Sequence, residues 1–184
     1  MAHHHTETRA ELRTASTDAA PPTRTAFRTA YDAVLADWPG PVERTELPTP
    51  YGLTHVNSAG PADAPPLVLL PGGGATSTVW GAAVAAGLAH THRVHAVDLV
   101  GDPGLSVPAE GAPIRTVADL MGWLDALLDG LAAGPVELAG HSYGAWIAAH
   151  YAAYDGTRAR PRAAEPDGDP AADPAANPAA DPAA

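Results

Sequence analysis

The chain has 184 residues, a formal net charge of −11, and 46% hydrophobic but only 5% aromatic residues. Its ten basic residues are all arginines and are scattered, which argues against a nucleic-acid or membrane partner. It has no cysteine, which excludes disulfides and thiolate sites. No apolar run approaches the roughly 20 residues of a membrane span, and the N-terminus lacks the apolar core of a signal peptide. We therefore expect a cytoplasmic protein.

The first 60 residues predict a disordered segment, one helix and two short strands. Residues 1–23 are polar and end with two prolines, which favours disorder. Residues 42–61 are typical of two strands around a turn at Pro50, Tyr51 and Gly52. Between these segments, apolar residues recur at helical spacing until Pro39 and Gly40; they are Phe27, Tyr31, Val34, Leu35 and Trp38.

Short apolar runs then alternate with helical patterns. We predict strands at residues 66–70, 93–100 and 136–140, the first of them fully apolar and therefore buried on both faces. The predicted helices are one marked by Trp80, Val84 and Leu88, one at residues 117–131 and one at residues 143–154. Strands that alternate with helices indicate an α/β domain with a parallel sheet, here at residues 24–155.

The pattern ends near residue 156. Residues 156–184 are rich in proline, alanine and aspartate and close with a repeat of four residues, first seen at residues 169–172. A proline at every fourth position is incompatible with a regular helix or a central strand. We therefore expect a disordered tail, and its composition suggests the hypothesis of a frameshift or gene-model truncation near residue 158.

Ser142 is the candidate nucleophile. It lies in Gly140-His141-Ser142-Tyr143-Gly144, between a predicted strand and a predicted helix, which is the G-x-S-x-G pattern of a nucleophile elbow. The two glycines relieve crowding in the tight turn, and the following helix offers unpaired N–H groups to a developing oxyanion.

A glycine-rich loop, Pro71 to Gly74, follows the first buried strand. A phosphate-binding P-loop would need a lysine, and the chain has none. A dinucleotide-binding loop would need G-x-G-x-x-G, to which Gly72, Gly74 and Ser77 come close, with Asp98 as the ribose-binding acid. An oxyanion loop needs bare backbone near the substrate and also accounts for Ser142.

Five segments within residues 27–155 resemble the N-terminal half of an α/β-hydrolase, in family order: "YGLTHVNSAG", "PPLVLLPGGGATSTVW", "RVHAVDLVGDPGLSV", "DLMGWLDALLDGL" and "ELAGHSYGAW". The resemblance implies a three-layer α/β/α sandwich with a mostly parallel sheet, in the strand order 1-2-4-3-5-6-7-8. In that order the strand at residues 136–140 is an open edge of this chain, with possible self-association through it.

The resemblance also assigns the site and the chemistry. Ser142 matches the nucleophile, and Gly73 and Tyr143 match the donors of the two oxyanion N–H groups. Pro71 replaces a loop-ordering histidine of the family, and Asp98 matches an aspartate that is usually structural. The implied activity is hydrolysis of a small-molecule ester or related acyl substrate, without cofactor or metal.

The triad acid and histidine cannot be named. In this family both follow the serine along the chain, and no histidine follows His150. His141 and His150 are expected to be out of reach of the Ser142 hydroxyl. We therefore expect a form that is inactive by itself, and keep as alternatives a non-catalytic fragment that acts through its sheet edge and a dinucleotide binder. A metal site is a further alternative, at the histidine cluster of His90, His92 and His95.

Overall fold

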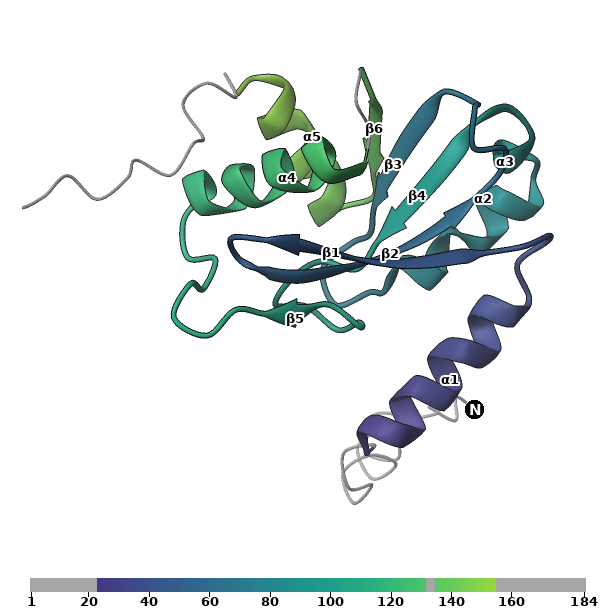
Figure 1. The fold of residues 1–184 in the computed structure, drawn as a ribbon, viewed down its shortest axis with the longest axis horizontal. Coiled ribbons are helices and arrows are strands. Elements are labelled where there is room, and N and C mark those ends of the chain that lie inside the picture. Colours follow the sequence, from purple (N-terminus) through teal and green to yellow (C-terminus); the bar gives the residue numbers. More distant parts are fainter. Residues whose placement is uncertain (1–22, 132–134, 155–184) are drawn as a thin grey trace, which may run out of the picture.

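The computed structural model describes residues 23–131 and 135–154. Apart from Thr23, the predicted disordered segments at residues 1–23 and 156–184 lie outside this part of the chain. Figure 1 shows the arrangement of the elements, which are α1 (Arg24–Ala36), β1 (Glu43–Thr49), β2 (Gly52–Ala59), β3 (Pro66–Leu70), η2 (Ser77–Trp80), α2 (Gly81–Ala85), α3 (Leu88–Thr91), β4 (Arg93–Val97), β5 (Val107–Pro108), α4 (Val117–Leu131), β6 (Glu137–Gly140) and α5 (Tyr143–Ala152).

The described strands form one sheet in the order β1-β2-β4-β3-β6, with β5 paired to β2. Strand β3 is parallel to both β4 and β6, whereas β2 is antiparallel to β1, β4 and β5. The predicted order is therefore confirmed over these strands, and within the described residues the sheet is mixed, with parallel pairs at β3 and antiparallel pairs at β2. A two-residue connection between β1 and β2 can join only antiparallel strands, and β2 then enters the sheet against the direction of β4.

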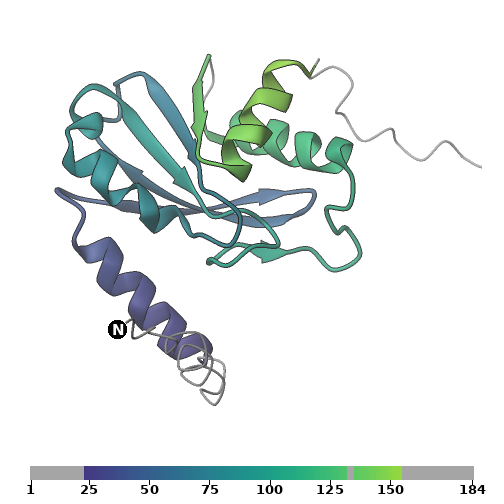
Figure 2. The same ribbon diagram turned by 180° about the vertical axis from the view of Figure 1, so that it is seen from behind.

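Alternation along β3 separates two apolar cores, one on each face of the sheet. Val68 and Leu70 pack with α4 and α5, whereas Leu67 and Leu69 pack with α1 and the α2 region. Side chains of a strand point alternately to opposite faces, so an uninterrupted apolar run indicates cover on both. Figures 1 and 2 show α4 and α5 together on one side of the sheet, which confirms the predicted three layers.

Two local predictions hold closely. Helix α4 spans the residues predicted from its apolar spacing, and it begins with a capping box in which Asp119 accepts the N–H of Thr116 and donates its own N–H to the Thr116 hydroxyl. The β1–β2 turn is stabilised by Thr49, whose hydroxyl accepts the Tyr51 N–H and donates to the Gly52 carbonyl. Both features depend on neighbours in sequence.

The predicted helix around Trp80, Val84 and Leu88 is wrong as a single element. It consists of the 3₁₀ turn η2 and the short helices α2 and α3. Gly87 has a φ of 103°, a left-handed conformation that glycine adopts at little cost and that ends α2. The two-residue strand β5 was not predicted, because its identity comes from pairing with β2.

Strand β6 pairs with β3 and with no other strand among the described residues, so its outer side is an open edge here. Next to it, Tyr143 and Trp146 of α5 stack with ring centroids 5.7 Å apart and are 41% and 39% exposed. The described chain therefore has an open strand edge and, on the helix that follows this strand, two exposed aromatic rings. In the same part of the chain, we find no helix with the combined length and hydropathy that crossing a bilayer requires.

Candidate active site

Ser142 occupies a strained turn between β6 and α5. Its φ of 52° and ψ of −114° make it the one described non-glycine residue with a positive φ. Such a conformation costs on the order of 1–3 kcal/mol and persists only where the surroundings impose it. The His141 N–H donates to the Leu70 carbonyl at 3.1 Å, and the Trp146 N–H donates to the Ser142 carbonyl at 3.0 Å. The sheet and the helix therefore hold the turn from both sides.

The two glycines of the turn are required by close backbone contacts. A Cβ on Gly140 would overlap the backbone of Gly144, and a Cβ on Gly144 would overlap the Leu70 carbonyl and lie 2.6 Å from the Pro71 carbonyl oxygen. Main-chain atoms cannot move aside as the end of a flexible side chain can. The predicted reason for glycine at both positions is confirmed, and the crowding involves β3 as well as the turn itself.

The glycine loop, which we define as residues 71–76, lies directly against this turn. A Cβ on Gly72 would be 3.5 Å from the Ser142 Cβ and 3.0 Å from Nδ1 of His141, and a Cβ on Gly73 would be 3.7 Å from the Tyr143 Cβ. The Ala75 N–H donates to the Gly72 carbonyl at 3.1 Å, which closes the loop into a turn. The structure thus brings the three predicted site residues, Ser142, Gly73 and Tyr143, into one cluster.

The cluster is suited to stabilise negative charge beside Ser142. Tyr143 is the first residue of α5, whose ten residues direct the positive end of the helix dipole toward the turn. Within the described residues, no hydrogen bond occupies the backbone N–H of Gly73 or Tyr143. The Tyr143 N–H thus lies at the N-terminus of α5, and the Gly73 N–H lies in the glycine loop packed against the same turn.

One contact in this region was missed by the sequence reasoning. The Asp102 carboxylate accepts the Gly74 N–H at 3.3 Å and so ties the glycine loop to the loop that follows β4. Asp102 belongs to no periodic pattern and to no part of the G-x-S-x-G motif, and no signal in the sequence indicates this contact.

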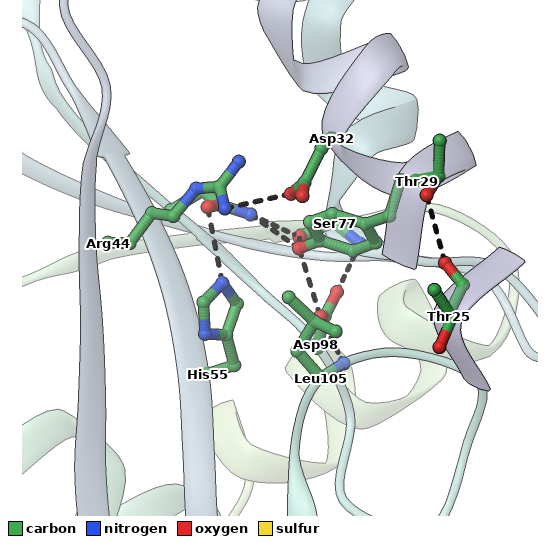
Figure 3. Close-up of polar contacts among 10 residues, drawn as sticks. Thr25, Thr29, Asp32, Arg44, His55, Ser77, Asp98 and Leu105 are labelled. Carbon is green, nitrogen blue, oxygen red and sulfur yellow. Dashed lines mark hydrogen bonds and ion pairs between the residues drawn. The ribbon is translucent and has the colours of Figure 1, made fainter. Parts of the chain in front are cut away.

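Asp98 is a structural residue, as predicted. It is fully buried, its Oδ1 accepts the Ser77 N–H at 2.7 Å, and its Oδ2 accepts the Leu105 N–H at 2.8 Å (Figure 3). A Cβ on Gly104 would lie 2.7 Å from the Asp98 Cγ, so the loop after β4 closes tightly over the carboxylate. These contacts leave Asp98 unavailable to a ribose hydroxyl, which removes the acidic residue that a dinucleotide-binding site would need.

In the described part of the chain, His92 and His150 each contact a polar group other than the Ser142 hydroxyl. Nε2 of His92 lies 3.6 Å from the Glu137 carboxylate, and Nδ1 of His150 lies 3.0 Å from the Trp146 carbonyl oxygen of its own helix. Neither His141 nor His150 forms a hydrogen bond with the Ser142 hydroxyl. Within residues 23–131 and 135–154, no group of three or more histidine, aspartate or glutamate side chains could hold a metal ion.

His95 is buried in β4, with Nδ1 2.8 Å from the Ser58 hydroxyl of β2. Burial, reinforced by the nearby Arg93 charge and partly offset by Glu43, lowers the pKa of His95 to about 4. Burial likewise lowers the pKa of His55. The folded chain therefore keeps the His95 ring neutral at pH values where an unfolded chain protonates it.

We expect acid to destabilise the fold through His95. Between its ordinary pKa near 6.5 and the folded value of about 4, the unfolded state gains a proton that the folded state does not. His95 alone thus lowers the free energy of unfolding by on the order of 3 kcal/mol as the pH falls through this window. Urea unfolding at pH 7.5 and 4.5 measures how much unfolding free energy is lost between these pH values. The loss should be smaller for His95→Gln than for wild type, and the exposed His90→Gln, as control, should lose as much as wild type. Equal losses in all three proteins would contradict this prediction.

Comparison with known proteins agrees with the geometry of the turn and loop. The model of the alpha/beta hydrolase family matches residues 67–184, which is more than half of the chain. The chain belongs to the alpha/beta hydrolase family. As an alpha/beta hydrolase it is similar to carboxylesterase YbfK of Bacillus subtilis (strain 168), with 39% identity over 118 residues, and to the uncharacterized carboxylesterase nap of the same organism, with 37% identity over 114 residues.

Solved structures of alpha/beta hydrolases are likewise similar to this chain over part of their length. Naproxen esterase (carboxylesterase NP) from Bacillus subtilis matches with a TM-score of 0.65 and 30% identity, over 72% of this chain and 46% of that one. Carboxylesterase CesB (YbfK) from Bacillus subtilis matches with a TM-score of 0.63 and 36% identity, over 68% and 43%. The chain spans about two fifths of the length of its curated relatives: the matches cover 64% and 62% of this chain but only 39% and 37% of the relatives.

Proposed function

We propose that the chain carries the nucleophile and the oxyanion-binding groups of a serine hydrolase that acts on carboxylic esters or related acyl substrates. The observation that carries the proposal is the strained Ser142 turn packed against the glycine loop. The names of the relatives, both called carboxylesterases, support the choice of esters.

In the proposed reaction, the Ser142 oxygen attacks the ester carbonyl carbon. The electron pair of the carbonyl double bond moves to its oxygen, and the backbone N–H groups of Gly73 and Tyr143 stabilise the resulting oxyanion. Collapse of this tetrahedral species breaks the bond to the leaving-group oxygen, which takes up the proton that Ser142 lost and departs as the alcohol, and an acyl-serine remains. Two N–H groups at fixed positions cost no reorganisation when the charge develops, which is why the rigidity of the turn matters.

The Ser142 proton needs a base, and no described residue forms a hydrogen bond with the hydroxyl. Removal of the base from a serine triad costs on the order of 10⁶ in turnover. We therefore propose that this chain by itself turns over esters far more slowly than an intact member of its family. Binding of negative charge by Gly73 and Tyr143 does not depend on the base.

A fluorophosphonate probe tests the nucleophile. We expect slow labelling of the folded chain at Ser142, identified by mass spectrometry of the labelled peptide, and complete loss of labelling in Ser142→Ala. Heat-denatured wild type is the control for nonspecific reaction and should also be unlabelled, because the turn exists only in the folded chain. Absence of labelling in folded wild type, or labelling that persists in Ser142→Ala, would refute the proposed nucleophile.

A second candidate function is non-catalytic association through the open edge of β6. The open edge and the exposed Tyr143 and Trp146 rings of α5, the helix that follows β6, favour it. Sedimentation velocity over a range of concentrations tests this candidate. Self-association that weakens in Trp146→Ala would support it, and a monomer at all concentrations would exclude a second copy of the chain as the partner.

A further inference from the structure

We propose that helix α1, through the hydroxyl of Tyr31, positions the glycine loop and is thus part of the support of the oxyanion-binding groups. The inference rests on the proposed function of Ser142 and Gly73. Helix α1 lies before the residues that the family model matches, residues 67–184. Tyr31 would be a positioning residue, because it acts on the site through other residues.

The Tyr31 hydroxyl reaches a buried polar cluster between α1 and the sheet. The side chain is 4% exposed, and its oxygen lies 2.6 Å from Nδ2 of Asn57, 2.8 Å from the Ser77 hydroxyl and 3.0 Å from Oδ2 of Asp98. Figure 3 shows Ser77, Asp98 and Leu105 of this cluster together. All four side chains that the hydrogen bonds join are buried.

Every hydrogen in the cluster has an acceptor. Tyr31 donates to the Asp98 carboxylate, Ser77 donates to the Tyr31 oxygen, and the two amide hydrogens of Asn57 go to Tyr31 and to the Ser77 oxygen at 2.9 Å. Burial and the Asp98 charge raise the pKa of Tyr31, which keeps the hydroxyl protonated and able to donate. A phenylalanine would fill the same space but would leave Ser77 and Asn57 each with an unused donor.

This cluster fixes the end of the glycine loop. Ser77 follows the loop directly. Its N–H donates to the Asp98 carboxylate and its hydroxyl forms a hydrogen bond with the Tyr31 hydroxyl, so two polar groups of this residue are held in place. The other end of the loop continues from Leu70 of β3, a buried strand. A six-residue loop with both ends held has little freedom, and Gly73 lies within it.

A second contact joins α1 to the same region. The indole N–H of Trp38, just after α1, donates to the Thr78 carbonyl at 3.4 Å, and a Cβ on Gly81 would lie 2.7 Å from that indole nitrogen. The chain after the glycine loop therefore packs against α1 along η2. Tyr31 provides the contact nearest the loop, and it is the one that a single-atom change can remove.

Hydrogen exchange of the full chain tests the proposal with Tyr31→Phe. The amides of Gly74, Ala75 and Ser77 report on the loop, since each has a hydrogen-bond acceptor, and those of Leu124 and Leu127 in α4 report on the opposite core. We expect exchange of the loop amides to rise about tenfold relative to the α4 amides, as loss of one buried hydrogen bond predicts.

Leu35→Ala is the matched control. Leu35 is also 4% exposed and lies on α1, but it contributes only apolar contacts. Its replacement should lower the stability of the whole chain at least as much, without a selective rise at Gly74 and Ala75. The proposal is overturned if Tyr31→Phe and Leu35→Ala change loop and α4 exchange in the same proportion, or if loop exchange stays at the wild-type rate.

Ser77→Ala provides a second variant if Tyr31→Phe does not fold. It removes the other partner of the same hydrogen bond and leaves the Ser77 N–H on Asp98. If Tyr31 acts through Ser77, the double variant Tyr31→Phe, Ser77→Ala should raise loop exchange no more than the stronger of the two single variants. A rise equal to the product of the two single effects would contradict action through Ser77. If wild type is labelled by the fluorophosphonate, Tyr31→Phe should slow labelling about tenfold. If it is not labelled, the proposed hydrolase chemistry fails, and loop exchange alone still decides the role of Tyr31.

Discussion

Gly144→Ala is expected to destabilise the fold by on the order of 3 kcal/mol and to abolish reaction of Ser142 with a fluorophosphonate. The added Cβ would overlap the Leu70 carbonyl of β3 and lie 2.6 Å from the Pro71 carbonyl oxygen. Leu70 is fully buried and ends β3, which is paired with β4 on one side and β6 on the other, so its carbonyl cannot move aside easily. Helix α5 must then move away from β3, which separates the Tyr143 N–H from Gly73. Gly140→Ala should behave alike, because its Cβ would meet the Gly144 backbone.

Gly130→Ala is the matched control for Gly144→Ala. Gly130 lies inside helix α4, where an added Cβ would make an ordinary contact of 3.7 Å with the Leu47 side chain. Since alanine is favoured over glycine in a helix interior, we expect a gain of about 0.5–1 kcal/mol. Urea unfolding of the three variants measures the difference. A Gly144→Ala protein as stable as wild type would show that the turn can relax, and the steric account of the elbow would then be incorrect.

Asp98→Asn is expected to cost about 3 kcal/mol of unfolding free energy, although it changes only one oxygen to an NH₂ group. Oδ1 and Oδ2 of Asp98 each accept a backbone N–H, from Ser77 and Leu105. An amide has a single acceptor oxygen. Either orientation of the asparagine therefore places its NH₂ group against a buried N–H donor, and the remaining bonds lose the help of the negative charge.

Asp102→Asn is the control for Asp98→Asn, since it makes the same chemical change four residues away. Asp102 is only partly buried and accepts one weaker hydrogen bond, from Gly74 at 3.3 Å. We expect a loss below about 0.5 kcal/mol, as for surface substitutions in general. Chemical unfolding at pH 7 compares the two variants. Similar losses of unfolding free energy in both variants would mean that the burial of Asp98 and the two N–H groups it accepts do not explain its contribution to stability.

Much of the fold could be predicted because its signals are local. The apolar spacing of residues 117–131 defines α4 within a few turns, and the apolar run at residues 66–70 defines β3 within one short segment. Strand direction is not local. It depends on which strands pair, and the antiparallel pairing of β2 with β4 joins residues about 40 positions apart. The mixed sheet and strand β5 therefore could not be obtained from periodicity.

The sequence alone determined the turn at Ser142, because a tight strand–helix turn leaves no room for a Cβ two residues before or after the serine, and both positions are glycine. By resemblance to the family, it also predicts Gly73 and Tyr143 as the donors of the two oxyanion N–H groups. Only the tertiary structure decided that the glycine loop lies against the elbow, and that Tyr31 bonds with Ser77 and Asp98, which are 46 and 67 residues away along the chain. Hydrogen bonds between buried side chains depend on distances of a few tenths of an ångström, and those distances are set only when helix α1 packs on the sheet.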